Sequence, residues 1–206
     1  MTPIIVIPCK SLDRGKSRLQ GVLDHAQRRD LCQQFLTHTI ALATSVIGPQ
    51  QIKIVSADGA VREIARCHEI EVLSDPGGGL NQALDHARHA LMSAEIGAQA
   101  IMVLPIDLPM ATPADIEAVL ASSSDVTIVA DEAGRGTNVL LLGVKALPTF
   151  EFSYGIDSIA AHKVHADACG HSFELLERPG LQLDVDEPAD LERWIAVRGT
   201  QSEQLR

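Results

Sequence analysis

Aspartates that could bind a metal stand in two distant stretches of the sequence. Asp107 directly follows an apolar run, in P-I-D-L-P, and Asp184 and Asp186 stand together in L-D-V-D-E-P. Alternation along an extended segment puts the last two carboxylates on one side, where they repel each other unless a cation lies between them. A turn or helix cap is the alternative for Asp107 and for Asp186, but not for Asp184. Three oxygen ligands of this kind suit Mg²⁺ and not zinc, so the sequence predicts a magnesium site.

A second stretch is rich in cations. Four of the 17 Lys and Arg residues of the chain fall within nine positions: Lys10, Arg14, Lys16 and Arg18. They follow the first apolar run and Pro8, and backbone N–H groups and cations in such a loop can neutralise the oxygens of a triphosphate. The spacing matches neither a P-loop nor a dinucleotide-binding fingerprint. A solvated basic loop is the alternative.

Glycines and hydroxyls mark three further loops. Residues 77–79 are glycines and precede Leu80 and Asn81, so the backbone there can approach a flat ligand. A turn without a ligand is the alternative. Thr137 follows Gly136 before an apolar run, and residues 154–158 precede a predicted helix. Their hydroxyls and N–H groups could hold a carboxylate or phosphate, although ordinary helix capping explains the second segment as well.

Histidines and cysteines give weaker signals. His86 with His89, and His162 with His165, have the spacing of helical metal ligands, but without a third ligand nearby we expect them on helix surfaces. No arrangement typical of a serine or cysteine nucleophile occurs. The four cysteines are far apart, which predicts neither a disulfide framework nor a zinc cluster and favours a reducing, cytoplasmic location.

Length and composition limit the possible domain organisation and the classes of partner. With 206 residues and 46% hydrophobic content, the chain has room for one domain with a sizeable core, expected over residues 1–198 with a tail at 199–206. A formal charge of −10 argues against a nucleic-acid partner. No apolar run approaches membrane-spanning length, so no membrane partner is expected. The apolar start near Ile4 is interpreted as a core strand and not as a signal peptide.

Short apolar runs alternate with helical patterns along the chain. Strands are expected at 4–8, 52–56, 71–73, 101–104, 126–130, 138–142 and 173–176. Helices are expected at 25–47, 59–67, 80–96, 113–122, 157–169 and 188–198. This alternation predicts a three-layer α/β fold with a mostly parallel sheet. Ligands of such sheets bind beyond the carboxyl ends of the strands, where the loops described above would meet.

Six short blocks in fixed order extend over nearly the whole chain. They are P-x-K with K-S-R-L (8–19), G-L-N (79–81), D-L-P (107–109), G-T-N (136–138), G-x-x-S-x-x-x-H (155–162) and L-D-V-D-x-P-x-D-L (183–191). On these blocks the chain resembles the CofC/FbiD type of guanylyltransferase. That family is similar to the MobA-like nucleotidyltransferases, with the nucleotide-diphospho-sugar transferase fold. Its members attach GMP to 2-phospho-L-lactate, phosphoenolpyruvate or 3-phospho-D-glycerate in coenzyme F-420 biosynthesis.

The resemblance implies a role for each matching position. Two Mg²⁺ ions would be held by Asp107, Asp184 and Asp186. The phosphorylated acid would be bound by Thr137, Gly155 and Ser158. GTP would be bound by Pro8, Lys10, Lys16, Gly79, Leu80 and Asn81, with Lys10, Lys16, Arg18 and Asp107 as catalytic residues. Cys9, Ile159 and Glu187 depart from the residues usual in the family, and Ile159 lies beside the expected acid pocket.

Other functions remain open from the sequence alone. A sugar-phosphate or molybdopterin nucleotidyltransferase would use the same fold and metal, and a nucleotide-sensing module would bind GTP without turnover. A Rossmann dehydrogenase is disfavoured because the glycine fingerprint is missing. The expected partners are GTP and a phosphorylated three-carbon acid, and a homodimer stays open.

Overall fold

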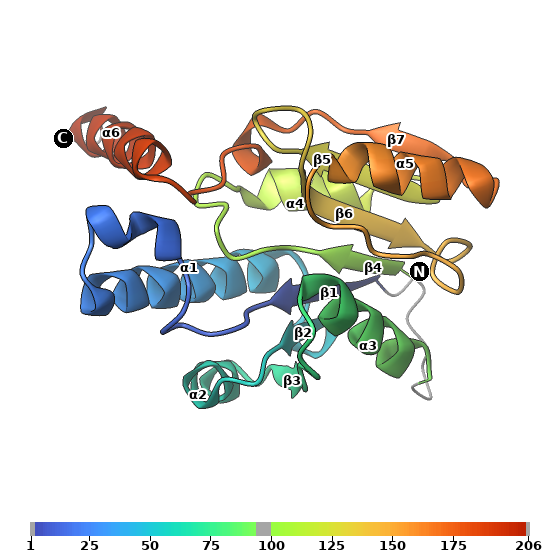
Figure 1. The fold of residues 1–206 in the computed structure, drawn as a ribbon, viewed down its shortest axis with the longest axis horizontal. Helices are drawn as coiled ribbons and strands as arrows, with labels where there is room; N and C mark the ends of the chain where they lie inside the picture. Colours follow the sequence, from blue (N-terminus) through green and yellow to red (C-terminus); the bar gives the residue numbers. More distant parts are fainter. Residues whose placement is uncertain (1–2, 94–99, 205–206) are drawn as a thin grey trace.

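Seven strands form one sheet in the computed structural model, which describes residues 3–93 and 100–204 (Figure 1). The strands are β1 (Pro3–Pro8), β2 (Ile52–Val55), β3 (Glu71–Leu73), β4 (Ala100–Val103), β5 (Val126–Ala130), β6 (Thr137–Gly143) and β7 (Phe173–Leu175). Their order is β3-β2-β1-β4-β6-β5-β7. Strand β6 runs antiparallel to both of its neighbours, and every other pair is parallel. The mostly parallel sheet predicted from the sequence is confirmed.

Helices cover both faces of the sheet. They are α1 (His25–Val46), α2 (Gly59–Cys67), α3 (Leu80–Met92), α4 (Pro113–Leu120), α5 (Ser158–Ala168) and α6 (Pro188–Gln204), with 3-10 turns at Ser17–Gly21, Pro49–Gln51 and Pro179–Leu181. Side chains of α1, α2 and α4 share one apolar core with the sheet, and those of α3 and α5 share a second core on the opposite face. The three-layer prediction is therefore confirmed.

Helix ends agree with the sequence at most positions. The expected third helix extended to 96, whereas α3 ends at Met92 with Ser93 as its C-cap, and residues 94–96 lie outside the described part of the chain. Helix α6 continues to Gln204, six residues past its expected end within the region that we interpreted as a tail. Residues 205 and 206 are again outside the described residues.

Local chemistry explains where the helices begin. The side chain of Asp24 accepts the N–H of Gln27 at 2.8 Å, and the Gln27 side chain accepts the N–H of Asp24 at 2.9 Å, which starts α1. Thr112 and Asp115 form the same reciprocal capping box at α4. Such a box satisfies backbone donors that have no partner inside the helix.

A small third core joins α6 to α1. The rings of Phe35 and Trp194 pack edge to face with centroids 5.1 Å apart, and Val185 and Leu191 are buried beside them. This packing fixes the segment that precedes α6, which contains two of the candidate metal ligands. No helix in the described residues is both long and apolar enough to pass through a membrane.

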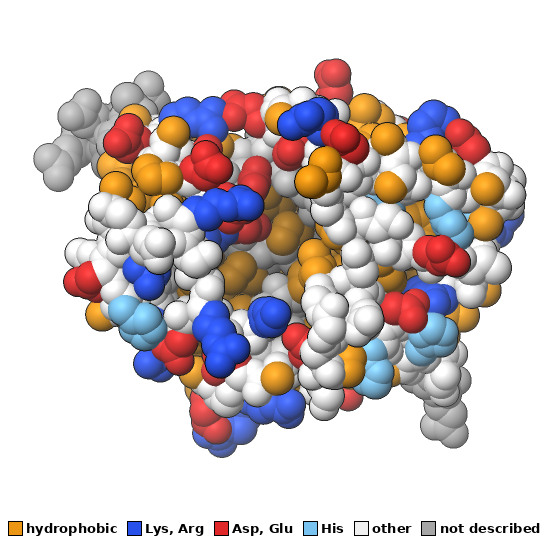
Figure 2. Space-filling model, in the orientation of Figure 1, with side chains coloured by type: hydrophobic (Ala, Val, Ile, Leu, Met, Phe, Trp, Pro, Cys, Tyr) orange, Lys and Arg blue, Asp and Glu red, His pale blue; other side chains and the backbone are white. Residues whose placement is uncertain are grey.

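The strand directions bring several loops to one edge of the sheet. Strands β1 and β4 are parallel neighbours, so their carboxyl ends lie side by side. Because β6 runs antiparallel to β4, the start of β6 at Thr137 lies at this same edge. Figure 2 shows a hollow in the middle of the face seen in Figure 1, with hydrophobic side chains inside it and both acidic and basic side chains around it.

Candidate active site

The two aspartate-bearing stretches meet around one lysine. Lys16 Nζ lies 2.6 Å from a carboxylate oxygen of Asp107 and 2.7 Å from one of Asp186, and the Lys16 side chain is only 6% exposed. The backbone also joins the stretches, because the N–H of Val185 donates to the carbonyl of Asp107 at 3.0 Å. We call Lys16, Asp107, Asp184 and Asp186 the carboxylate–lysine cluster. The convergence expected from the sequence is present in the structure.

Close packing of the basic loop against α1 brings Lys16 into this position. A Cβ atom on Gly15 would lie 2.4 Å from Sγ of Cys32, so only glycine allows the approach without displacing that thiol. Lys16 itself has a left-handed backbone with φ of 52°, immediately before the 3-10 turn Ser17–Gly21. The turn then presents Arg18, whose guanidinium lies 3.4 Å from Asp186 and is 67% exposed in its side chain.

Charges inside the cluster shift the pKa values of its members. Burial alone would lower the pKa of Lys16, but the carboxylates of Asp107 and Asp186 outweigh it and raise this pKa, so the ammonium group stays charged. Burial raises the pKa of Asp184 to about 6, with further contributions from the charges of Asp107 and Asp186. Asp184 is therefore the carboxylate that most lacks a positive partner.

The carboxylate oxygens of the cluster suit a hard cation, but the point that Asp107 and Asp186 both face is occupied by the ammonium group of Lys16. Among the residues that the structure describes, no three His, Cys, Asp or Glu side chains are arranged as a ready metal site. Asp107 and Asp186 already face one point, since both contact the same Nζ atom. Their oxygens, with those of Asp184 nearby, fit Mg²⁺ once Lys16 withdraws.

A cavity of about 230 Å³ lies beside the cluster, at the ends of β1 and β4. Its lining includes four residues expected to bind the nucleotide, Pro8, Lys10, Gly79 and Leu80, together with Asp75 and Asp107. Lys10 is exposed, and its pocket neighbour Leu80 is 42% exposed at the start of α3. The side chain of Asp75 accepts the N–H of Gly77 at 2.8 Å and so shapes the glycine turn. The cavity offers an apolar wall with one cation at its mouth.

Asn81 behaves differently from its neighbours in the glycine loop. Its side-chain amide donates to the carbonyl of Tyr154 at 3.1 Å and accepts the N–H of Tyr154 at 2.8 Å. Asn81 thus joins the start of α3 to the turn that contains Gly155, which has a φ of 142°. Both polar ends of this side chain are used within the protein.

Thr137, Ser158 and His162 form a buried network of neutral groups, which we call the hydroxyl–imidazole network. The Ser158 hydroxyl lies 3.0 Å from Thr137 Oγ1 and accepts the N–H of Thr137 at 2.8 Å. Nδ1 of His162 lies 3.1 Å from the same Thr137 oxygen, and Nε2 accepts the N–H of Ser153 at 2.9 Å. The exposed fractions of the three residues are 8%, 1% and 0%. The two hydroxyls predicted to bind the acid are therefore neighbours.

The structure corrects the prediction for His162. We expected a helix-surface histidine, whereas the side chain is fully buried, because Thr137 at the start of β6 and the rings of Phe150 and Tyr154 lie against it. A signal was present in the sequence, since His162 follows Ser158 by one helical turn and so shares its face. His86 and His89 are exposed, as predicted. Burial raises the pKa of Cys9 to about 12, so this thiol is a poor nucleophile at neutral pH.

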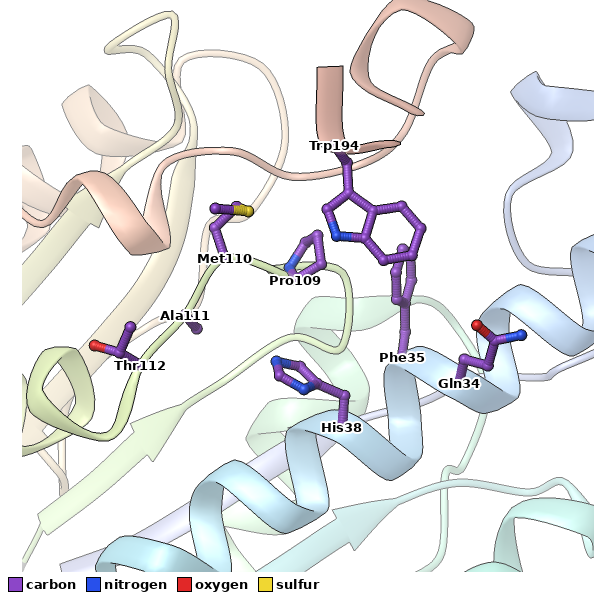
Figure 3. Close-up of a pocket in the computed structure, with 8 residues that line it drawn as sticks. All are labelled: Gln34, Phe35, His38, Pro109, Met110, Ala111, Thr112 and Trp194. Carbon is purple, nitrogen blue, oxygen red and sulfur yellow. The ribbon is translucent and has the colours of Figure 1, made fainter. Parts of the chain in front are cut away.

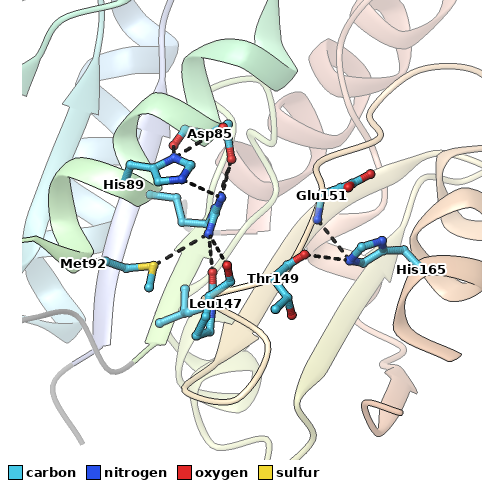
Figure 4. Close-up of polar contacts among 9 residues, drawn as sticks. Asp85, His89, Met92, Leu147, Thr149, Glu151 and His165 are labelled. Carbon is cyan, nitrogen blue, oxygen red and sulfur yellow. Dashed lines mark hydrogen bonds and ion pairs between the residues drawn. The ribbon is translucent and has the colours of Figure 1, made fainter. Parts of the chain in front are cut away.

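Two of the larger cavities lie outside these groups. One of about 410 Å³ lies between α1, the loop after β4 and α6, where Figure 3 shows Trp194 next to Phe35 and Pro109. The other, of about 650 Å³, is lined by α3 and the segment after β6 (Figure 4). There the buried Arg88 donates to the carbonyls of Leu147 and Pro148 at 2.6 and 3.2 Å. These bonds hold the segment after β6 in place, and they occupy the guanidinium group of Arg88.

Comparison of the sequence with known proteins identifies a family model and several relatives that match nearly the whole chain. Residues 3–205 match the family model described as CofC-like guanylyl transferase. Phosphoenolpyruvate guanylyltransferase of Rubrobacter xylanophilus is 38% identical over 205 residues, covering 98% of this chain and 97% of the relative. Relatives from Chloroflexus aggregans and Conexibacter woesei, with 37% and 33% identity, carry the same name.

Solved structures agree on the fold. A protein from Desulfovibrio desulfuricans assigned to the nucleotide-diphospho-sugar transferases superposes with a TM-score of 0.69 at 14% identity, over 92% of this chain and 84% of that one. A CMP:2-keto-3-deoxy-manno-octonic acid synthetase bound to CTP gives a TM-score of 0.66 at 16% identity, over 98% and 100%. At these identities the likeness shows the fold alone, which is the nucleotidyltransferase fold predicted from the sequence.

Proposed function

The chain belongs to the CofC-like guanylyl transferase family, and from this premise we propose that it transfers GMP from GTP to the phosphate of a small phosphorylated acid. Phosphoenolpyruvate is the first candidate, because the relatives carry its name; 2-phospho-L-lactate and 3-phospho-D-glycerate are the others. We further propose that the product enters coenzyme F-420 biosynthesis, as the family resemblance implies. The observation that carries the proposal is the convergence of Asp107 and Asp186 on Lys16.

The proposed reaction needs no protein nucleophile or base. A phosphate oxygen of the acid, already ionised near neutral pH, forms a bond to the α-phosphorus of GTP. The bond from that phosphorus to the oxygen bridging the α- and β-phosphates breaks, and pyrophosphate leaves with the electron pair. The protein therefore has to align the two phosphates and balance charge on the leaving group.

Cations of the basic loop suit the triphosphate. Lys10 is exposed at the mouth of the cavity beside the cluster, where it can meet phosphate oxygens as the nucleotide enters. Lys16 is bound to two carboxylates, and a negatively charged triphosphate gives its ammonium group an alternative partner. Arg18 lines a hollow of about 280 Å³ together with Asp184 and Asp186.

Magnesium is the cofactor that we propose for the cluster. Asp107, Asp184 and Asp186 would hold it, and when bound it would neutralise charge on the reacting phosphates. The carboxylates would lose the Lys16 ammonium as a partner and gain a divalent cation, while Lys16 becomes available to the leaving pyrophosphate. The buried network of Thr137 and Ser158 would bind the acid, next to the turn at Gly155.

The compartment and the binding partners are proposals as well. All four cysteines are free thiols, and the reducing cytosol suits such thiols. The proposal involves GTP and the acid as partners, with neither nucleic acid nor membrane.

Incubation of the purified protein with GTP, Mg²⁺ and each of the three acids tests the proposal. Mass spectrometry should detect a guanylylated acid in at least one reaction, with pyrophosphate released in equal amount. GTP with glucose 1-phosphate as the acceptor is the control for sugar-phosphate transfer. A product with the sugar phosphate alone, or pyrophosphate without a guanylylated acid, would contradict the proposed acceptor class.

A further inference from the structure

The imidazole of His162 has a defined protonation in this structure. A backbone N–H can only donate, so Nε2 of His162, which accepts from Ser153 at 2.9 Å, carries no proton. A neutral ring then carries its proton on Nδ1 and donates it to Thr137 Oγ1, 3.1 Å away. The ring is neutral because burial lowers the pKa of His162 to about 4, with a smaller contribution from His165.

Neighbouring rings hold this arrangement in place. Phe150 lies 5.5 Å from the imidazole centroid and Tyr154 lies 5.2 Å from it, the latter edge to face. The side chain is 0% exposed, so solvent cannot offer either ring nitrogen another partner. Rotation of the ring by 180° would break both hydrogen bonds at once.

A count of protons shows what the hydroxyl pair can still do. Ser158 Oγ accepts the N–H of Thr137, and Thr137 Oγ1 accepts from Nδ1 of His162. The two hydroxyls lie 3.0 Å apart and one of them donates to the other. Two O–H protons are present and only one is used between them, so one O–H remains unused in this network. It can donate to an anion bound at the edge of the sheet.

With the other tautomer of His162, the hydroxyl pair would have no O–H left to donate to a ligand. With the proton on Nε2, the Thr137 hydroxyl would donate to Nδ1 while the Ser158 hydroxyl donated to Thr137. Both protons would then be used inside the protein, and only lone pairs would face the ligand. Lone pairs repel a phosphate or carboxylate oxygen, so the position of a single proton decides whether the site attracts an anion.

We propose that His162 is a positioning residue, which makes the Thr137–Ser158 pair a donor toward the phosphorylated acid and at the same time anchors the 153–155 turn. The inference rests on the proposed function for the identity of the acid. It assigns to His162 no contact with the substrate, since its action passes through Thr137 and Ser153.

Binding of phosphoenolpyruvate without turnover tests this role. Calorimetry is done in the presence of Mg²⁺ and a GTP analogue with a methylene bridge between the α- and β-phosphates. Thr137→Val should weaken phosphoenolpyruvate binding about 10- to 100-fold, the loss expected for one hydrogen bond to a charged group. His162→Gln, which can replace the Nε2 acceptor but not the Nδ1 donor, should weaken it about 10-fold. His162→Asn can replace the Nδ1 donor but not the Nε2 acceptor, so it should weaken binding by only about threefold, through the lost anchor of the 153–155 turn.

Matched variants separate positioning from general damage. His165→Gln makes the same change one turn further along α5, on a half-buried side chain, and should leave phosphoenolpyruvate binding unchanged. In the double variant Thr137→Val/His162→Gln, binding should be no weaker than in Thr137→Val alone, because His162 acts through the hydroxyl that is already missing. The proposal would be overturned if the affinity losses of the two single variants multiplied in the double variant. It would also be overturned if a folded His162→Gln protein bound phosphoenolpyruvate like wild type.

Nitrogen-15 spectra of the histidine rings give a readout that needs no variant and no activity. His162 should show a protonated Nδ1 and an unprotonated Nε2 at pH 7, and the reverse pattern would overturn the proposal. The proposed function can fail separately: the protein would then bind phosphoenolpyruvate as predicted yet form no guanylylated product. If product forms but the variants bind phosphoenolpyruvate like wild type, only the present inference fails.

Discussion

The carboxylate–lysine cluster and the hydroxyl–imidazole network lie at the same edge of the sheet and are held in opposite ways. In the cluster, full charges decide the geometry. Among the described residues no cation forms an ion pair with Asp184, and its pKa is raised to about 6 by burial and by the neighbouring carboxylates. In the network, the groups are neutral and close-packed, and a single O–H is left over. On the functions proposed for them, the first region would exchange its cation, whereas the second is already arranged for the acid.

This difference has a physical reason. Charged groups can exchange partners at little cost when another charge takes the place of the first, as Mg²⁺ would for Lys16. A buried hydrogen-bond network has no such substitute, and breaking it leaves unsatisfied polar atoms. Substitutions in the cluster should therefore affect turnover first, and substitutions in the network should affect acid binding and stability.

The largest effect is expected at Asp184. Asp184→Asn should lower kcat by about 10²- to 10³-fold, the loss typical of one electrostatic contact in a transition state. Folding should be kept, because an amide avoids the charge whose burial raises the pKa of Asp184 to about 6. Turnover is measured by pyrophosphate release and stability by thermal unfolding. Asp167→Asn, on the exposed face of α5, is the control, and near-normal turnover by Asp184→Asn would remove the metal assignment.

The next largest effect is expected at Lys16, the cation of the carboxylate–lysine cluster. Lys16→Met should reduce kcat/KM for GTP about 10- to 100-fold and destabilise the protein without Mg²⁺, because Asp107 and Asp186 lose their cation. Mg²⁺ should raise the Tm of this variant more than that of wild type, since no ammonium competes for the carboxylates.

Lys10→Met provides the matched control in the same loop. Lys10 is exposed and lines the neighbouring cavity, so its loss should weaken GTP binding without changing the Tm of the protein in the absence of Mg²⁺. An equal Mg²⁺-dependent shift of Tm in wild type and Lys16→Met would mean that Lys16 does not exchange with the metal.

A smaller effect concerns pH and the buried imidazole. The folded-state pKa of His162 is lowered to about 4, so between pH 6.5 and 4 the unfolded chain binds a proton that the folded protein does not. Its contribution to stability is complete above pH 6.5 and is lost as the pH falls toward 4, at about 1.4 kcal/mol per pH unit for one proton. The stability gap between wild type and His162→Asn in urea should shrink from pH 7 to pH 5. His165→Gln is the control, and a constant gap for His162→Asn would contradict the buried neutral ring.

The smallest effect tests the link between the two regions. Asn81→Ala should raise KM for the acid about 3- to 10-fold, because the Tyr154 backbone loses two hydrogen bonds that hold the turn at Gly155. The KM for GTP should change less than this. Gln82→Ala, an exposed neighbour on α3, is the control. If KM for GTP rises and KM for the acid does not, Asn81 acts on the nucleotide as the family resemblance implies.

Local patterns were enough to predict most of the fold. Continuous burial of β1, β4 and β5 appears in the sequence as apolar β-branched runs, and Thr112-Pro113 marks the start of α4. The rule that ligands bind beyond the strand ends also predicted that Asp107 would approach Asp184 and Asp186.

Long-range partners could not be predicted in the same way. Nothing near Lys16 in the sequence indicates that its ammonium group fills the point between two carboxylates, since Asp186 is 170 positions away. The buried Arg88 is a second case, because its carbonyl acceptors lie 59 and 60 positions further on in the sequence. The burial of His162 depends on how α5 packs. Its spacing from Ser158 shows only that the two side chains share a helix face, and not that this face is buried.

Anomalous diffraction from crystals grown with Mn²⁺ and the methylene-bridged GTP analogue tests the central claim most directly. The account predicts a manganese peak within bonding distance of carboxylate oxygens of Asp107 and Asp186, with Lys16 Nζ moved away from both and toward the triphosphate. A peak elsewhere, or a Lys16 that still bridges the two carboxylates while the nucleotide is bound, would contradict it.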